Sequence, residues 1–210
     1  MPLLTPEQAL GFLAAASLLT LAPGPDNLLV LALGASRGRR AGLAFGLGCA
    51  AGCLSHTLLA TLGIGALIAA SPLAFGILKG AGGLYLLWLG IQALKNAAPA
   101  TVDRRPTPDD TPGQLFRRGL IANAINPKVV VFFLAFLPPF VAPGRGDVAL
   151  QIAQLGLLFT LQAALLFSLI AVAAGRLGGL LARYPGLSCR LERTTGLLFV
   201  LLGLHLLFVA

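Results

Sequence analysis

The sequence predicts an all-α integral membrane protein with six transmembrane helices. Of its 210 residues, 57% are hydrophobic and only 10% are charged. The apolar residues gather in stretches of about twenty or more, the length at which a helix crosses a hydrocarbon core about 30 Å thick. The chain lacks the alternating ten-residue segments of an outer-membrane barrel, so the spans are expected to be helices.

Six apolar stretches are separated by turn signals, and each is expected to cross the membrane once. The stretches are Ala9–Leu33, Ala41–Ala70, Pro72–Leu94, Phe116–Val141, Val148–Gly175 and Thr194–Val209. The signals between them, in chain order, are Gly34–Arg40, Ser71–Pro72, Asn96–Gln114, Pro143–Asp147 and Tyr184–Arg193. Thr5 and Gln8 form a capping-box pattern with Pro6 at the first helical position, so the first helix is expected to begin there.

The positive charges lie mostly on one side of this predicted topology. The net charge is +8, and twelve of the fifteen Lys and Arg residues fall in or beside the first, third and fifth loops. The positive-inside rule makes that side cytoplasmic and places both termini outside. Topology and contact with anionic lipid headgroups explain these cations, so the basic composition does not indicate a nucleic-acid partner.

The polar third loop divides the chain into two halves. We expect a first three-helix repeat at residues 1–95, a flexible cytoplasmic loop at 96–114 and a second three-helix repeat at 115–210, all within one membrane domain. An odd number of spans in each half makes any structural repeat antiparallel. This 3+3 inverted repeat is the architecture of many secondary transporters.

Helices 1 and 4 are each interrupted by proline. Pro23, Gly24 and Pro25 interrupt the first, and Pro127 follows Asn126 in the fourth. Proline removes a backbone donor and disfavours helix in the residue before it, so carbonyls lose their partners where no water is present. Matching interruptions in the two halves are the strongest sequence indication of a transport site.

Four polar residues beside these breaks are predicted to bind substrate: Asp26, Asn27, Asn126 and Lys128. Asp26 and Asn126 each lie eight residues from the cytoplasmic end of their span, about 12 Å into the membrane, so the four are expected to share one pocket. In a structural interpretation, Asp26 caps the restarted helix and pairs with Lys128. In a functional one, which we favour, Asp26 holds a substrate ammonium while Lys128 and a half-helix N-terminus hold a carboxylate.

Three segments of the chain carry a family resemblance. They are "APGPDNLLVLALGASRGRRAGLAFGLG", "SPLAFGILKGAGGLYLLWLGIQAL" and "FRRGLIANAINPKVVVFFLAFLPPFV". Together they resemble the LysE/RhtB family of bacterial amino-acid exporters over nearly the whole chain. The paired PGP and NPK motifs, in this order, are its most specific signature.

The resemblance implies efflux of amino acids across the bacterial inner membrane. In that membrane, the outward side that the positive-inside rule gives both termini is the periplasm. It also implies that Lys79, which spacing alone would place as a residue reaching the lipid headgroups, faces the pathway as a secondary site residue. Exporters of basic amino acids in the family tend to carry an acidic residue shortly after the NP element. Here residues 129–133 are apolar, which favours neutral substrates such as homoserine, threonine or leucine-like amino acids.

The expected mechanism is alternating access, with Asp26 as the candidate for proton coupling because it is the only acidic residue deep in a predicted span. A passive channel for small amphipathic solutes is the alternative. The sequence is compatible with a homo-oligomer as well as a monomer. The small-residue pairs Gly42/Gly46, Gly48/Gly52 and Gly76/Gly80 allow close helix packing either within one subunit or between subunits.

Other patterns do not indicate catalysis or a cofactor. Cys49, Cys53 and His56 share one helical face, but a fourth metal ligand is missing and we predict no metal site. The "GASRG" segment matches a hydrolase pattern, yet it lies in a basic loop between helices rather than on a strand-turn-helix. The protein is therefore predicted not to be an enzyme and to need no cofactor.

Overall fold

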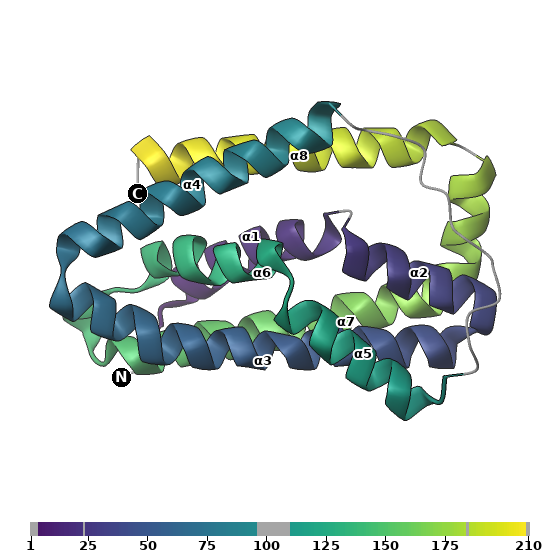
Figure 1. The fold of residues 1–210 in the computed structure, drawn as a ribbon, viewed down its shortest axis with the longest axis horizontal. Coiled ribbons are helices and arrows are strands. Elements are labelled where there is room, and N and C mark those ends of the chain that lie inside the picture. Colours follow the sequence, from purple (N-terminus) through teal and green to yellow (C-terminus); the bar gives the residue numbers. More distant parts are fainter. Residues whose placement is uncertain (1–3, 23, 96–109, 184, 209–210) are drawn as a thin grey trace.

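A computed structural model describes residues 4–22, 24–95, 110–183 and 185–208 (Figure 1). The elements in these ranges are all helical, as predicted. They are α1 (Pro6–Leu21), α2 (Pro25–Arg37), α3 (Arg39–Ala70), α4 (Pro72–Lys95), α5 (Pro112–Ala124), α6 (Pro127–Val131), the π-helical turn η1 (Phe132–Phe136), the 3-10 turns η2 (Pro138–Phe140) and η3 (Pro143–Arg145), α7 (Val148–Arg183) and α8 (Pro185–Phe208).

Capping and proline chemistry set the helix starts. The predicted capping box at α1 is confirmed, because the Gln8 amide donates to the Thr5 hydroxyl at 3.2 Å and the Thr5 amide donates to the Gln8 side chain at 2.9 Å. A second capping box, between Thr111 and Gln114, begins α5. Each box satisfies backbone donors that a helix start leaves without partners.

The two predicted interruptions divide spans 1 and 4. α1 ends at Leu21 and α2 begins at Pro25, with the two bent by 62°. α5 and the segment Pro127–Phe140 are bent by 50°. Pro25 and Pro127 each lie in the first turn of the new helix, where the missing N–H costs nothing. Pro23 lies outside the described residues.

The described part of the chain does not confirm the six predicted membrane crossings. By length and composition, three helices of the described chain can cross a membrane: Arg39–Gly63, Val148–Leu177 and Cys189–Phe208. Counting each bent pair as one span raises the number to five. The breaks explain part of the difference from six, since neither half of a broken span is long enough to cross alone.

The helices pack in a definite pairing. α3 packs against α5 and α7, α2 packs against α7 and α3, and α4 packs against α8. In Figure 1, α1 and α6 run between the α4–α8 pair and the α3, α5 and α7 helices. The start of α1, the turn between α3 and α4, and the end of α8 lie at one end of the molecule, and the end of α2 lies at the other (Figure 1).

Glycines allow α3 and α5 to approach closely. A Cβ atom on Gly48 would lie 2.0 Å from the Phe116 carbonyl oxygen, and one on Gly119 would lie 2.1 Å from the Phe45 carbonyl oxygen. Gly42 and Gly46 similarly face α7. Gly76 and Gly80 have no described neighbour within 4 Å of such a Cβ, so the packing expected of this pair is not seen here.

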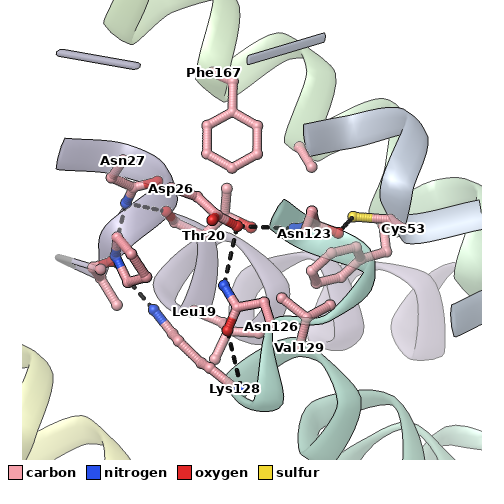
Figure 2. Close-up of a pocket in the computed structure, with 15 residues that line it drawn as sticks. Leu19, Thr20, Asp26, Asn27, Cys53, Asn123, Asn126, Lys128, Val129 and Phe167 are labelled. Atoms are coloured by element: carbon pink, nitrogen blue, oxygen red, sulfur yellow. Dashed lines mark hydrogen bonds between the residues drawn. The ribbon is translucent and has the colours of Figure 1, made fainter. Parts of the chain in front are cut away.

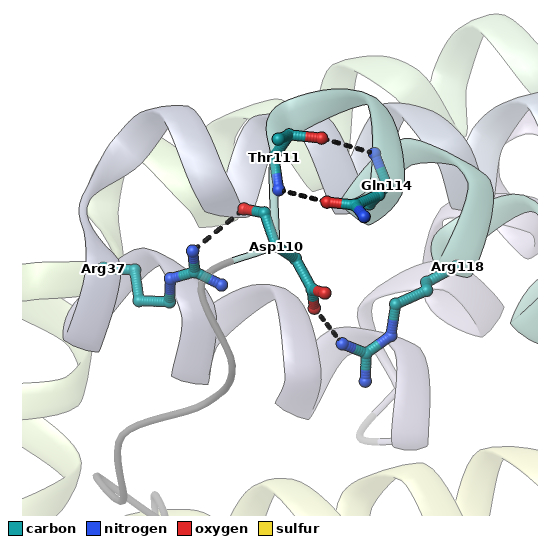
Figure 3. Close-up of polar contacts among 5 residues, drawn as sticks. All are labelled: Arg37, Asp110, Thr111, Gln114 and Arg118. Atoms are coloured by element: carbon teal, nitrogen blue, oxygen red, sulfur yellow. Dashed lines mark hydrogen bonds and ion pairs between the residues drawn. The ribbon is translucent and has the colours of Figure 1, made fainter.

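Polar contacts join the end of α2 to the start of α5 (Figure 3). The Arg37 guanidinium donates to the Asp110 carbonyl oxygen at 2.9 Å. The Asp110 carboxylate forms an ion pair with Arg118, one α5 turn beyond the capping box. These contacts connect the arginine-bearing ends of the two broken spans on the same side of the molecule.

Candidate functional site

A small cavity lies where the two broken helices meet (Figure 2). Its lining includes all four predicted substrate ligands, Asp26, Asn27, Asn126 and Lys128. Aromatic and small side chains of α7 form an apolar part of the wall. The cavity measures about 30 Å³, which is room for about two water molecules.

Asp26 lies in the first turn of α2 and is 7% exposed. Its Oδ2 accepts hydrogen bonds from the Asn123 Nδ2 at 2.9 Å and the Asn126 Nδ2 at 3.0 Å. Its Oδ1 has no hydrogen-bond partner in the described part of the chain. Because a helix N-terminus favours negative charge, α2 itself stabilises this carboxylate. One carboxylate oxygen is thus held by protein donors, and the other is available to a cation in the cavity.

Lys128 lines the same cavity but does not pair with Asp26. Its Nζ donates to the Ala22 carbonyl oxygen at 3.2 Å and lies 5.2 Å from the centroid of the Phe199 ring. The structure has no ion pair between Lys128 and Asp26, so the pairing expected under the structural interpretation is wrong for this conformation. The ammonium is held by a carbonyl and an aromatic face, both weaker partners than a carboxylate.

The two predicted asparagines form hydrogen bonds with backbone groups at the two helix interruptions. Asn27 donates through Nδ2 to the Thr20 carbonyl at 2.6 Å and the Ala22 carbonyl at 2.9 Å. These bonds satisfy two carbonyl groups at the end of α1. The Asn126 Oδ1 accepts from the Lys128 backbone N–H at 3.1 Å and so caps α6. Asn126 also reaches Asp26, whereas both Asn27 amide hydrogens are engaged by backbone.

Sequence reasoning missed Asn123, which is 2% exposed and lies at the centre of the network. Besides donating to Asp26, its Oδ1 accepts from the Cys53 thiol at 3.4 Å. Its carbonyl oxygen lies 3.0 Å from the His56 Nε2, which must carry the proton because a carbonyl only accepts. A signal was present: Asn123 and Asn126 are three residues apart beside the proline, so two amides face one side.

Cys53 and His56, on one face of α3, therefore both contact Asn123 beside the interruption between α5 and α6. The Asn123 carbonyl has no N–H partner four residues on, because that residue is Pro127; it accepts from the Asn126 backbone N–H at 2.9 Å, and His56 adds a side-chain hydrogen bond. Cys53 contributes its thiol to the cavity lining. Among the described residues, no three His, Cys, Asp or Glu side chains are grouped to hold a metal ion.

The remaining predicted residues lie as follows. Gly24 and Pro25 line the cavity, and Gly24 precedes α2 without a side-chain cap. Pro127 begins α6. Lys79 is half-buried on α4 and is not among the described residues that line the cavity.

Replacing Asn123 with Leu is expected to slow transport at least about tenfold and to lower the free energy of unfolding by about 1–3 kcal/mol. The similar-sized apolar side chain removes one donor from Asp26 and removes the amide oxygen that accepts from the Cys53 thiol, which keeps only the Cys49 carbonyl at 3.5 Å. Transport assays and thermal unfolding in detergent measure both effects. Cys53→Ser, which keeps a donor at that position, is the control, and wild-type behaviour of Asn123→Leu would contradict a central role for this amide.

Comparison with known proteins finds a translocator family and membrane-protein relatives. The LysE type translocator family matches residues 17–209. A homoserine/homoserine lactone efflux protein of Salmonella typhimurium is 32% identical over 200 residues, covering 95% of this chain and 96% of that protein. An uncharacterized membrane protein of Vibrio cholerae is 35% identical over 198 residues, covering 94% and 95% of the two chains. No solved structure matches.

The family match and the architecture lead to the same assignment. The match covers both helix breaks and every residue that lines the cavity between them. The apolar helices and the membrane-protein relatives indicate a multi-pass membrane protein, and the efflux relatives indicate a transporter of small molecules rather than an enzyme. The chain belongs to the LysE type translocator family.

Proposed function

We propose that this protein exports neutral amino acids from the bacterial cytoplasm across the inner membrane by alternating access. The observation that carries the proposal is the arrangement of two opposite charges, Asp26 and Lys128, which line one cavity without pairing with each other. An ammonium ion and a carboxylate on one substrate would complement these charges. The efflux of homoserine by relatives supports a substrate of this class.

In the proposed complex, the Asp26 Oδ1 accepts from the substrate ammonium. Lys128 leaves the Ala22 carbonyl for the substrate carboxylate, a stronger charge-assisted partner. The start of α2 has no side-chain cap, so its backbone N–H groups add a second attraction for the carboxylate. Apolar residues beyond Lys128, from Val129 onward, place no second acidic group there for a basic side chain.

Transport requires this cavity to open. Its volume of about 30 Å³ is several times smaller than an amino acid, so the cavity must widen before it can hold one. A second cavity of about 580 Å³ lies farther along α2 and α7, beside Gly34, Arg39 and Arg176. Near Gly34 the helices are in close contact, since a Cβ there would lie 2.5 Å from the Ala174 Cβ. We infer that separation of α2 from α7 admits substrate from the cytoplasm.

The packing supports six spans arranged as two inverted repeats, at residues 1–95 and 115–210, joined by 96–114. Each half has a broken span followed by two long helices. Exchanging the halves converts the α3–α5 contact into the α7–α1 contact, which is also present, and maps the α3–α7 and α4–α8 contacts onto themselves. The start of α1 and the end of α8 lie away from the arginine-bearing end, which under the positive-inside rule places both termini in the periplasm.

Efflux from dipeptide-fed cells tests the proposed function. Cells expressing the protein are expected to release homoserine, threonine or leucine faster than vector controls, with no acceleration of lysine release. Release of none of the neutral amino acids, or of lysine alone, would overturn the proposal. Counterflow exchange in proteoliposomes, which a transporter shows and a channel does not, distinguishes alternating access from a passive pore.

Proton coupling is a separable part of the proposal, with Asp26 as the coupling group. Proteoliposomes loaded with substrate are expected to release it faster when the outside is acidified. If a pH gradient has no effect on transport by the purified protein, proton coupling is excluded while export stands.

A further inference from the structure

Beside the cavity lies a polar pair that the charged site does not use. The Thr20 hydroxyl, in a side chain that lines the cavity, donates to the Gln162 Oε1 at 3.4 Å. Thr20 is near the end of α1, and Gln162 lies on α7 between Phe159 and Ala163, which also line the cavity. The pair therefore borders the site along its apolar wall, joining the broken first span to the second half of the chain.

Gln162 has an amide nitrogen without a partner. Its Nε2 is buried, and it is the one buried side-chain nitrogen or oxygen in the described part of the chain that makes no hydrogen bond. A buried donor in this state is costly, and more so where lipid surrounds the protein. The same amide's other bond, to Thr20, is long at 3.4 Å and weak. A ligand group that accepted a hydrogen bond from this nitrogen would therefore satisfy a buried donor, and the only bond it could disturb is the weak one to Thr20.

The pair offers one free donor and one free acceptor. The Gln162 Nε2 is the donor, and the Thr20 oxygen, whose proton points to Gln162, is the acceptor. If the amide is rotated by 180°, its nitrogen donates to the Thr20 oxygen instead. The Thr20 hydroxyl is then the free donor and the Gln162 oxygen the free acceptor, so the pair still offers one of each. An alcohol hydroxyl, which both donates and accepts, satisfies both sites with a single atom.

We propose that Thr20 and Gln162 form a side-chain specificity site that selects neutral amino acids bearing a hydroxyl over apolar ones of the same size. This inference rests on the proposed function and narrows its substrate class. Asp26 and Lys128 hold the groups shared by all amino acids, while the Thr20–Gln162 pair distinguishes the side chains. An apolar analogue leaves the buried amide unpaired, and this loss is the basis on which polar sites reject it.

Paired substrates test the specificity site. Homoserine and norvaline differ by a hydroxyl in place of a methyl group, and the assay measures their rates of counterflow in proteoliposomes. Wild type is expected to prefer homoserine at least about tenfold, the effect of one buried hydrogen bond. Gln162→Leu and, independently, Thr20→Val are each expected to reduce that ratio at least about fivefold.

The control is Gln154→Leu, the same change two turns earlier on α7 at a residue that does not line the cavity. It is expected to keep the wild-type ratio. Equal ratios in wild type, Gln162→Leu and Thr20→Val, with both substrates transported, would overturn the specificity site and leave amino-acid transport intact. Transport of neither substrate by wild type would overturn the specificity site, and the efflux assay with threonine and leucine decides separately whether the proposed export function stands.

Discussion

Asp26→Asn is expected to reduce amino-acid efflux at least about 30-fold while the protein still reaches the membrane. The substitution keeps the size of the side chain and removes the charge proposed to hold the substrate ammonium. Removing one partner of a buried, hydrogen-bonded charge pair costs about 2–5 kcal/mol, which sets the scale of the loss. Because one carboxylate oxygen accepts from both Asn123 and Asn126, the asparagine oxygen can keep both bonds, while its amide nitrogen replaces the free Oδ1 with a donor that cannot accept from an ammonium.

Asp147→Asn is the matched control for this substitution. Asp147 accepts from the Leu150 N–H at 3.0 Å at the exposed start of α7, and asparagine caps helices equally well. Its efflux is expected to equal that of wild type. Efflux by Asp26→Asn at the level of this control, with equal amounts of both proteins in the membrane, would reduce Asp26 to a structural cap.

Gly119→Ala is expected to destabilise the fold by about 1–3 kcal/mol or more, the range for overpacked interiors. The added methyl would lie 2.1 Å from the Phe45 carbonyl oxygen, a backbone atom that cannot rotate away. α3 and α5 would have to separate, which also pulls Asn123 from Cys53 and Asp26. Thermal unfolding of the purified protein and its amount in the membrane measure the effect.

Gly113→Ala provides the comparison on the same helix. Its Cβ would have no described neighbour within 4 Å, and alanine favours helix over glycine. It is expected to leave stability unchanged or slightly raised. If the two alanine variants unfold at the same temperature, the close approach of α3 and α5 does not contribute to stability.

Much of the site was predictable because proline has strict local consequences. Pro25 and Pro127 restart helices where the sequence indicated, and eight-residue spacings predicted that Asp26 and Asn126 lie at one depth. Their side chains are 3.0 Å apart. Local chemistry also predicted the capping box at Thr5, since every group in it lies within one turn.

The other features depend on contacts between distant segments. Asn123 becomes central because Gly52 lets α5 approach Cys53 on α3, 70 residues away. Lys128 turns to the Ala22 carbonyl and Phe199, partners that no spacing rule associates with it. The π-helical turn at Phe132–Phe136 precedes two prolines and belongs to an aromatic cluster around Phe132, and the period of the sequence does not reveal it.

Binding of charge-deleted analogues tests the central claim that Asp26 holds the substrate ammonium and Lys128 its carboxylate. The ligands are homoserine, 3-aminopropan-1-ol, which lacks the carboxylate, and 4-hydroxybutyrate, which lacks the ammonium. Purified wild type, Asp26→Asn and Lys128→Gln are titrated with each by calorimetry. We predict that wild type prefers homoserine over both analogues at least about tenfold.

Lys128→Gln is predicted to lose the preference for homoserine over 3-aminopropan-1-ol, because it no longer recognises the carboxylate. Asp26→Asn is predicted to lose the preference for homoserine over 4-hydroxybutyrate, because it no longer recognises the ammonium. If wild type discriminates and neither substitution changes either preference, the two charges do not bind the zwitterion and the account is contradicted.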